Sequence, residues 1–212
     1  MSAKEDLVLA AERLFALQGV EGVPLRQVGE EAGQRNVAAV QYHFGGRDGL
    51  IQAIFDFRLA RINVHRWAML ADVREAGLLR DVRALMEVLV WPLAEQAAVP
   101  GSHYVRFLNR MCDYEGRTVV PLSYVGLNSG IEVGELLSEA VGRDNEPDFV
   151  PRNELAGRLI LSGMAALEQR LAAHNWSMAD GSPDYEGYAD GIVDAVVAML
   201  TAPVLRRTRA RR

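Results

Sequence analysis

Apolar residues recur along most of this chain at the three- and four-residue spacing of amphipathic helices. Long alternating runs of β-branched residues, joined by the tight turns of hairpins, are almost absent. The pattern predicts an all-α fold of about nine helices, in which three short helices come first and about six longer ones follow.

The first fifty residues divide into three short helical segments. They are expected at about residues 4–18, at 25–32, and directly after Asn36, a competent N-cap. In the third segment three residues with helical spacing are expected to point inward: Val37, Val40 and Phe44. The opposite face then presents Ala38, Gln41, Tyr42 and Gly45.

The remaining helices are delimited by caps, prolines and glycines. They are expected at about 48–69, from Asp81 across a kink at Pro92, from Ser102 to about 114, and at 121–141, 152–174 and 184–200. The acidic segment 142–151 is predicted to be a loop. The expected domains are a helix-turn-helix unit at 1–46 and a larger helical domain at 47–205, followed by a basic tail at 206–212.

Composition limits the class of protein. With 212 residues, half of them apolar, the chain can bury one core, or one core and a small appended domain. No apolar run approaches the roughly 18 residues of a membrane span. The N-terminus has no signal-peptide pattern, and a lone cysteine, Cys112, suits a reducing compartment. We therefore expect a soluble cytoplasmic protein.

Charge is distributed unevenly along the chain. The net charge is −5, but five of the last seven residues are arginines, so the preceding 205 residues carry 18 basic and 28 acidic side chains. The tail is either a solvated, disordered end or an auxiliary phosphate-binding arm. An acidic body remains compatible with nucleic-acid binding, because only the docking face needs a positive potential.

The second and third segments have the form of a helix-turn-helix. A turn at 33–36 containing Gly33 joins them, and the second helix of such a unit enters the major groove. Gln41 can make a bidentate contact to adenine, and alanine methyl groups can meet thymine methyls. Phosphate contacts are expected from four residues: Arg35, Tyr42, His43 and Arg47. The alternative is an ordinary three-helix subdomain with an incidental polar face.

Two stretches carry a family resemblance, "AAERLFALQGVEGVPLRQVGEEAG" and then "YHFGGRDGL". In this order they make residues 7–50 resemble the N-terminal domain of the TetR family of transcriptional repressors. The resemblance implies that five residues face DNA: Arg26, Gln41, Tyr42, His43 and Arg47. The turn is one residue longer than usual, which leaves further base contacts open among Asn36, Val37, Ala38 and Ala39. Val23 stands where the family usually has threonine, and Arg47 stands where lysine is common.

Dimerisation is expected because a single small DNA-binding unit binds weakly, whereas two units roughly 34 Å apart match a two-fold operator. The last two helices combine small and apolar residues suited to pairing. The candidate interface consists of Leu159, Gly163, Ala166, Leu167, Ile192, Val193, Val196, Val197 and Leu200. The alternative is burial of these residues within one subunit. The family resemblance implies a four-helix bundle between two copies.

Aromatic residues and methionines are dense in the larger domain. The candidate pocket residues are Trp67, Met86, Trp91, His103, Tyr104, Phe107, Met111, Tyr124, Asn128 and Met164. Individually such residues are typical of a core, and as a set they match the ligand pocket that the resemblance implies. We expect an apolar or aromatic effector that favours a conformer in which the spacing of the two DNA-binding units does not match the DNA. The expected function is therefore a ligand-released repressor that binds a palindromic operator.

Two other classes of protein are compatible with an all-α chain of this length. An all-α enzyme would draw on His43, His65, His103, His174 and Cys112. No two histidines have metal-ligand spacing, the cysteine has no nucleophile signature, and no phosphate-binding glycine loop is present. We therefore expect no catalytic residue, no metal site and no cofactor. The other rival is a ligand-binding or scaffold protein without DNA binding.

Overall fold

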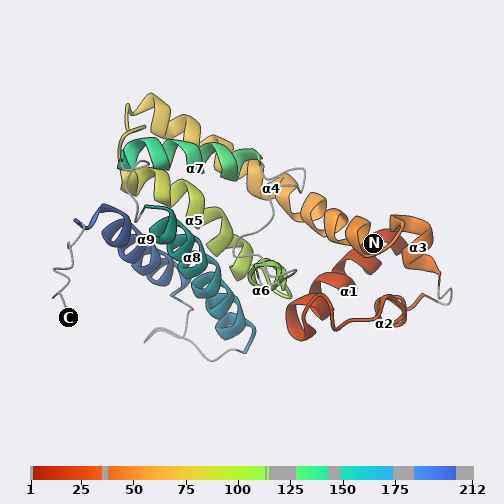
Figure 1. Ribbon diagram of the computed structural model, residues 1–212. Helices are drawn as coiled ribbons and strands as arrows, with labels where there is room; N and C mark the ends of the chain where they lie inside the picture. Colours follow the sequence, from red (N-terminus) through yellow and green to blue (C-terminus); the bar gives the residue numbers. More distant parts are fainter. Residues whose placement is uncertain are drawn as a thin grey trace, which may run out of the picture.

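The computed structural model describes residues 2–34, 38–112, 114, 128–142, 149–173 and 184–203. Within these ranges the chain forms nine α-helices and no strand, which confirms the all-α prediction (Figure 1). The helices are α1 (Ala3–Gln18), α2 (Leu25–Glu31), α3 (Ala39–Phe44), α4 (Arg47–Glu75), α5 (Val82–Ala98), α6 (Tyr104–Met111), α7 (Asn128–Val141), α8 (Phe149–Ala172) and α9 (Tyr185–Thr201).

The helices form two groups. Helices α1 to α3 lie at one end of the molecule and are termed the head, while α5 and α7 to α9 lie together at the other end and are termed the body (Figure 1). Helix α4 begins in the head and runs into the body, where it packs on α5 and α7. Helix α6 packs on α1 of the head and on α8 of the body. The two groups are therefore joined through α4 and α6.

Side-chain caps fix three helix starts. The Ser2 hydroxyl accepts a hydrogen bond from the backbone N–H of Glu5 at 3.2 Å, and the Glu5 carboxylate accepts one from the N–H of Ser2 at 2.8 Å. Asp81 caps α5 through the N–H of Ala84 at 2.9 Å, as predicted. Asp184 caps α9 in the same way. Each cap satisfies an N–H that has no partner within the helix.

Helix α3 is shorter than predicted. It begins at Ala39, and its N-cap is Ala38, which makes no side-chain capping bond, so the predicted cap at Asn36 is wrong. The helix is fixed by packing of Val40, which is buried against α2 and α4. It ends at Gly45, whose left-handed backbone (φ 71°) lets its N–H bond to the Gln41 carbonyl.

Three other boundaries differ from the prediction. Helix α4 continues to Glu75 because Leu70 is buried and Arg74 pairs with Glu132 of α7. Helix α6 has His103, not Ser102, as its N-cap. Helix α8 begins at Phe149, inside the predicted loop, and α7 is described from Asn128 onward, so the predicted start at 121 lies outside the described residues. None of the described helices is long and apolar enough to span a membrane.

Candidate DNA-binding surface and its connection to the body

The outer face of α3 presents polar and aromatic side chains to solvent. Gln41, Tyr42 and His43 are exposed, Tyr42 to 82%. Val40, on the opposite side, is buried and Phe44 is half-buried, as the spacing predicted. A short helix with one side anchored and the other open has the geometry needed to lie in a groove.

A hydrogen bond and a ring contact restrict the positions that the side chains of Gln41, Tyr42 and His43 can take. The Gln41 amide nitrogen donates to the Gly45 carbonyl at 3.1 Å, which holds the side chain along the end of the helix. The rings of Tyr42 and His43 meet edge to face, with centroids 5.0 Å apart. Partial ordering lowers the conformational entropy that a contact with a partner would cost.

The alanines at the start of α3 differ. Ala38 is exposed, whereas Ala39 is 5% exposed and packs into the core, so Ala39 cannot contact a base and the prediction for this residue is wrong. The predicted contact residues Arg35, Asn36 and Val37 lie outside the described residues.

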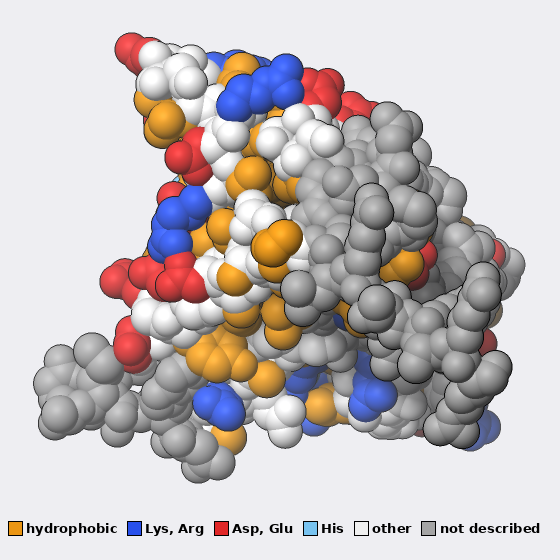
Figure 2. Space-filling view, turned by 60° about the vertical axis from the view of Figure 1, so that its left-hand side comes forward, with side chains coloured by type: hydrophobic (Ala, Val, Ile, Leu, Met, Phe, Trp, Pro, Cys, Tyr) orange, Lys and Arg blue, Asp and Glu red, His pale blue; other side chains and the backbone are white. Residues whose placement is uncertain are grey.

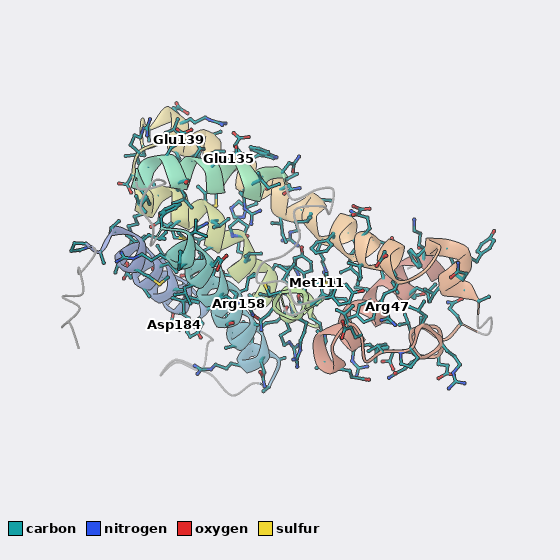
Figure 3. The ribbon with its side chains drawn as sticks, in the orientation of Figure 1. Arg47, Met111, Glu135, Glu139, Arg158 and Asp184 are labelled. Carbon is teal, nitrogen blue, oxygen red and sulfur yellow. The ribbon has the colours of Figure 1, made fainter. Side chains whose placement is uncertain are left out.

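Arg47 points into the head rather than toward a groove. Its guanidinium donates to the backbone carbonyl of Val20 and, at 2.8 Å, to that of Val23, and it lies 5.7 Å from the ring centroid of Phe15 (Figure 3). These bonds tie the start of α4 to the loop between α1 and α2. The predicted phosphate contact is therefore corrected, because the guanidinium is engaged by the protein itself. Val23, where the family has threonine, is fully buried.

Two exposed cations flank this face of the head. Arg26 is 72% exposed and lies 3.4 Å from Glu30, one turn along α2, an exposed pairing that contributes little to stability. Lys4 is exposed at the start of α1, and its ammonium lies 5.8 Å from the ring centroid of Phe44 in α3. Sequence reasoning missed Lys4. The sequence feature that could have identified Lys4 is that it is the only basic residue before Arg13.

At the junction of head and body lies a buried ion pair that the sequence did not reveal. Glu12 of α1 accepts two hydrogen bonds from Arg58 of α4, at 2.6 and 2.9 Å, and a third from the backbone N–H of His103 at 3.0 Å. Glu12 is almost wholly buried. The head is thereby bonded to the first residue before α6.

A second buried carboxylate holds the same end of α6 from the body. Glu168 of α8 accepts hydrogen bonds from the backbone N–H groups of Val105 and Arg106 at 3.2 and 3.0 Å, and from the Ser102 hydroxyl at 2.8 Å. The Arg106 guanidinium also donates to it at 3.1 Å. A negative charge is favourable at a helix N-terminus, so the start of α6 is fixed by one glutamate from each group of helices.

The predicted pocket residues do not surround one hollow in the described part of the chain. Five of them are packed in the core: Met86, Tyr104, Phe107, Met111 and Met164. Trp67, Trp91 and His103 are half-buried and Asn128 is exposed, while Tyr124 lies outside the described residues. One hollow of about 30 Å³ between α4 and α5 involves none of them. A larger hollow of about 340 Å³, between α1, α2 and the segment before α6, involves only His103.

Five of the predicted interface residues are likewise buried within the subunit: Leu167, Ile192, Val193, Val196 and Leu200. They are removed from the predicted interface, because α9 packs on both α5 and α8 and uses its apolar stripe there. Gly163 explains the close approach, since a Cβ at this position would lie 2.5 Å from the Ile192 Cδ1 atom. Leu159, Gly163, Ala166 and Val197 keep surface exposure.

Apolar surface remains on the outer side of α8. Leu155 and Val150 are each 60% exposed, and neither was among the predicted interface residues. Seen from the body end of the molecule, the visible face carries hydrophobic side chains down its middle, with charged side chains at its edge (Figure 2). Exposed apolar area of this kind is typical of surfaces that meet a partner.

Within the described residues, no cluster of His, Cys, Asp and Glu could hold a metal ion. His65 bonds to Glu95 at 2.8 Å, and Cys112 is buried.

Comparison with known proteins agrees with the geometry. Residues 7–54 match the sequence model of the family described as bacterial regulatory proteins, tetR family. No curated protein matches the chain in sequence. The chain is similar in structure to the HlyIIR protein, solved as a mutant with residues 170–185 substituted by alanine, with a TM-score of 0.54, 16% identity and coverage of 91% of this chain and 94% of that one.

A second similar structure is a TetR-like transcriptional regulator from Rhodococcus sp. RHA1, with a TM-score of 0.52, 16% identity and coverage of 95% of this chain and 97% of that one. The predicted resemblance is thus confirmed. The chain has the fold of a TetR-family transcriptional regulator, with an N-terminal helix-turn-helix domain and a helical C-terminal domain.

Proposed function

We propose that this protein is a sequence-specific DNA-binding repressor that acts as a homodimer on a palindromic operator and is released by a small molecule. The observation that carries the proposal is the face of α3, on which Gln41, Tyr42 and His43 are exposed while Val40 anchors the helix from behind. Enzymatic activity has no comparable support, because no cluster in the described residues could hold a metal ion.

In the proposed complex α3 lies in the major groove. Gln41 contacts a base edge, where its amide can pair with adenine, and Ala38 brings a methyl group toward the groove floor. Tyr42 and His43 donate to phosphate oxygens, as do the flanking cations Arg26 and Lys4. Arg35, Asn36 and Val37 stay candidates for further contacts on the same side. Arg47 acts indirectly, by fixing the start of α4 against the loop before α2.

Dimerisation is proposed through the outer surfaces of α8 and α9. Helix α8 offers Leu155 and Leu159, and α9 offers exposed small residues at Gly191, Ala195 and Ala198. Small residues let a second helix approach closely, so four helices from two copies can pack as a bundle.

Release by a ligand is proposed to pass through the junction of head and body. The start of α6 is bonded to Glu12 in the head and to Glu168 in the body, so a shift of α6 changes the position of the head. A ligand that binds one position of α6 more tightly shifts the population toward the matching spacing of the two heads, by an amount set by the difference in affinity.

Selection of bound sequences from random double-stranded DNA tests the proposal. The wild type is expected to enrich a palindrome with two half-sites, with an affinity that falls steeply as salt rises. Gln41→Ala should relax the preference at one base position in each half-site, at a cost of about 1–3 kcal/mol. Gln18→Ala, an exposed glutamine at the end of α1, is the matched control and should leave the preference unchanged.

Two results would count against the proposal. If the wild type enriches no sequence, the alternative of a ligand-binding protein without DNA binding is favoured. If Gln41→Ala and Gln18→Ala give the same preference as the wild type, α3 does not contact bases as proposed.

A further inference from the structure

A hollow of about 340 Å³ lies between the head and the segment before α6. It is lined by residues of α1, by the end of α2, and by Gly101 and His103. Ligand pockets in proteins start at about 300 Å³, so the hollow has room for a small organic molecule. Of the residues that the sequence placed in an effector pocket, His103 is the one found here.

The apolar part of the lining comes from Leu9, Ala10 and Ala32. Leu9 and Ala32 are half-buried, and Ala10 is buried in α1. Because two of these residues are alanines, little side-chain volume fills the space beside α1 and α2. The three side chains offer apolar surface against which the hydrocarbon part of a ligand can pack.

The charged part of the lining has an excess of negative charge. Three carboxylates contribute to it, from Asp6, Glu12 and Glu31. Glu31 pairs with Arg13, and Glu12 is bonded to Arg58 at 2.6 and 2.9 Å. The half-buried Asp6 carboxylate has no ion-pair or hydrogen-bond partner in the part of the chain that the structure describes. Its negative charge therefore remains available for a cation.

His103 adds a neutral acceptor to the same lining. Its Nδ1 atom lies 2.9 Å from the Gly101 carbonyl oxygen, which can only accept, so Nδ1 carries a hydrogen. In the neutral ring Nε2 is then unprotonated and can accept a hydrogen bond from a ligand. An ammonium group has three donors and no acceptor, which matches a carboxylate and an unprotonated ring nitrogen.

We propose that this hollow binds the effector, and that the effector is a small organic cation with an apolar or aromatic body and a protonated amine. The amine donates to Asp6 and His103, and the body packs against the apolar lining. An anionic ligand is disfavoured, because it would meet the unpaired charge of Asp6. This inference rests on the proposed ligand-released repression and specifies the chemical class of the ligand and its place.

The hollow lies where a ligand can act on the position of the head. One side belongs to α1 and α2, and the other side is the segment that leads into α6. The Glu12 carboxylate and the backbone N–H of His103, both at the hollow, are joined by the 3.0 Å hydrogen bond between head and body. A ligand bound there contacts both sides, so it favours the position of the head that accommodates it.

The test uses phenethylamine and hexylamine, with phenethyl alcohol and hexanol as uncharged counterparts at equal ionic strength. Both amines are protonated at neutral pH, as the side chain of lysine is. At ten times its Kd an amine should raise the Tm of the wild type by roughly 3–6 °C, and neither alcohol should do so at the same concentration.

Two variants test the charge and the place separately, with binding measured by isothermal titration calorimetry. Asp6→Asn keeps the shape of the side chain and removes its charge, so it should fold normally and weaken amine binding about tenfold. Ala32→Leu fills part of the hollow without changing the charge, and it should also weaken the binding of both amines. Asp72→Asn, the same substitution as the first at an exposed aspartate of α4, is the matched control and should bind as the wild type does.

The outcomes separate this inference from the proposed function. The site is rejected if neither amine shifts the Tm, if the alcohols act equally, or if either Asp6→Asn or Ala32→Leu binds as well as the wild type. DNA binding is measured in the absence of amine, and its failure rejects the repressor whatever the amines do. An amine that binds in the hollow should lower the affinity of the wild type for the selected DNA by at least about fivefold, and an unchanged affinity would reject its role as the effector.

Discussion

Arg47 and Arg26 belong to the same small head, yet their guanidinium groups have opposite surroundings. Arg47 is bonded to two carbonyls and lies over Phe15, whereas Arg26 extends into solvent beside Glu30. Helical spacing predicted that Val40 is buried and Gln41 exposed, because those positions follow from the period of one helix. It could not predict the bonds of Arg47, which reach residues more than twenty positions away.

This contrast predicts that two alanine substitutions affect different properties, the stability of the fold in one case and DNA binding in the other. Arg47→Ala removes charge-assisted bonds to two carbonyls and should lower the free energy of unfolding by about 2 kcal/mol, measured by urea denaturation. Arg26→Ala should change it by less than about 0.5 kcal/mol. In DNA titrations Arg26→Ala should instead reduce the slope of log affinity against log salt by about 1. Equal stability of the two variants would contradict the internal role of Arg47.

At the scale of elements, α9 shows why an apolar stripe does not identify its own partner. The helix has more apolar residues than packing against one neighbour needs. The additional residues could pack against a second copy of the chain or against a second helix of the same chain. In the structure Val193 and Val196 are buried within the subunit, where α9 packs on α5 and α8. On α8, by contrast, the side chains of Leu155 and Leu159 remain exposed.

Substitutions on the exposed side and on the buried side of α8 should therefore have different effects, the first on dimerisation and the second on folding. Leu155→Asp should weaken the proposed dimer, shifting the protein toward monomer in sedimentation velocity runs while the helical circular dichroism persists. Leu167→Asp places a charge in the subunit core and should prevent stable folding. Leu78→Asp, at an exposed leucine after α4, is the control and should do neither. A Leu155→Asp protein that remains dimeric would locate the interface elsewhere.

At the scale of the whole molecule, α4 and α6 carry the main connections between head and body. Helix α4 has 29 residues, about 44 Å of continuous helix, and α6 is held at its start by Glu12 and Glu168. The helices themselves followed from periodicity and caps. The buried glutamates did not, because a carboxylate in an amphipathic helix looks the same in sequence whether it meets water or a buried arginine. Their partners are set by packing between distant segments.

Such connections make the spacing of the two heads a property of the dimer, which predicts how the protein responds to spacing in its DNA. Inserting about five base pairs between the half-sites places them on opposite faces of the duplex, so only one head can bind at a time. Affinity, measured by fluorescence anisotropy at fixed salt, should fall by about 10²–10⁴, the gain that simultaneous binding of two sites supplies. Inserting about ten base pairs returns the two half-sites to the same face of the duplex but increases their separation by roughly 34 Å. Heads held by α4 and α6 cannot span this separation, so the affinity should stay low. If the five-base-pair insertion is harmless, the heads bind independently, and the α6 connection does not control their spacing.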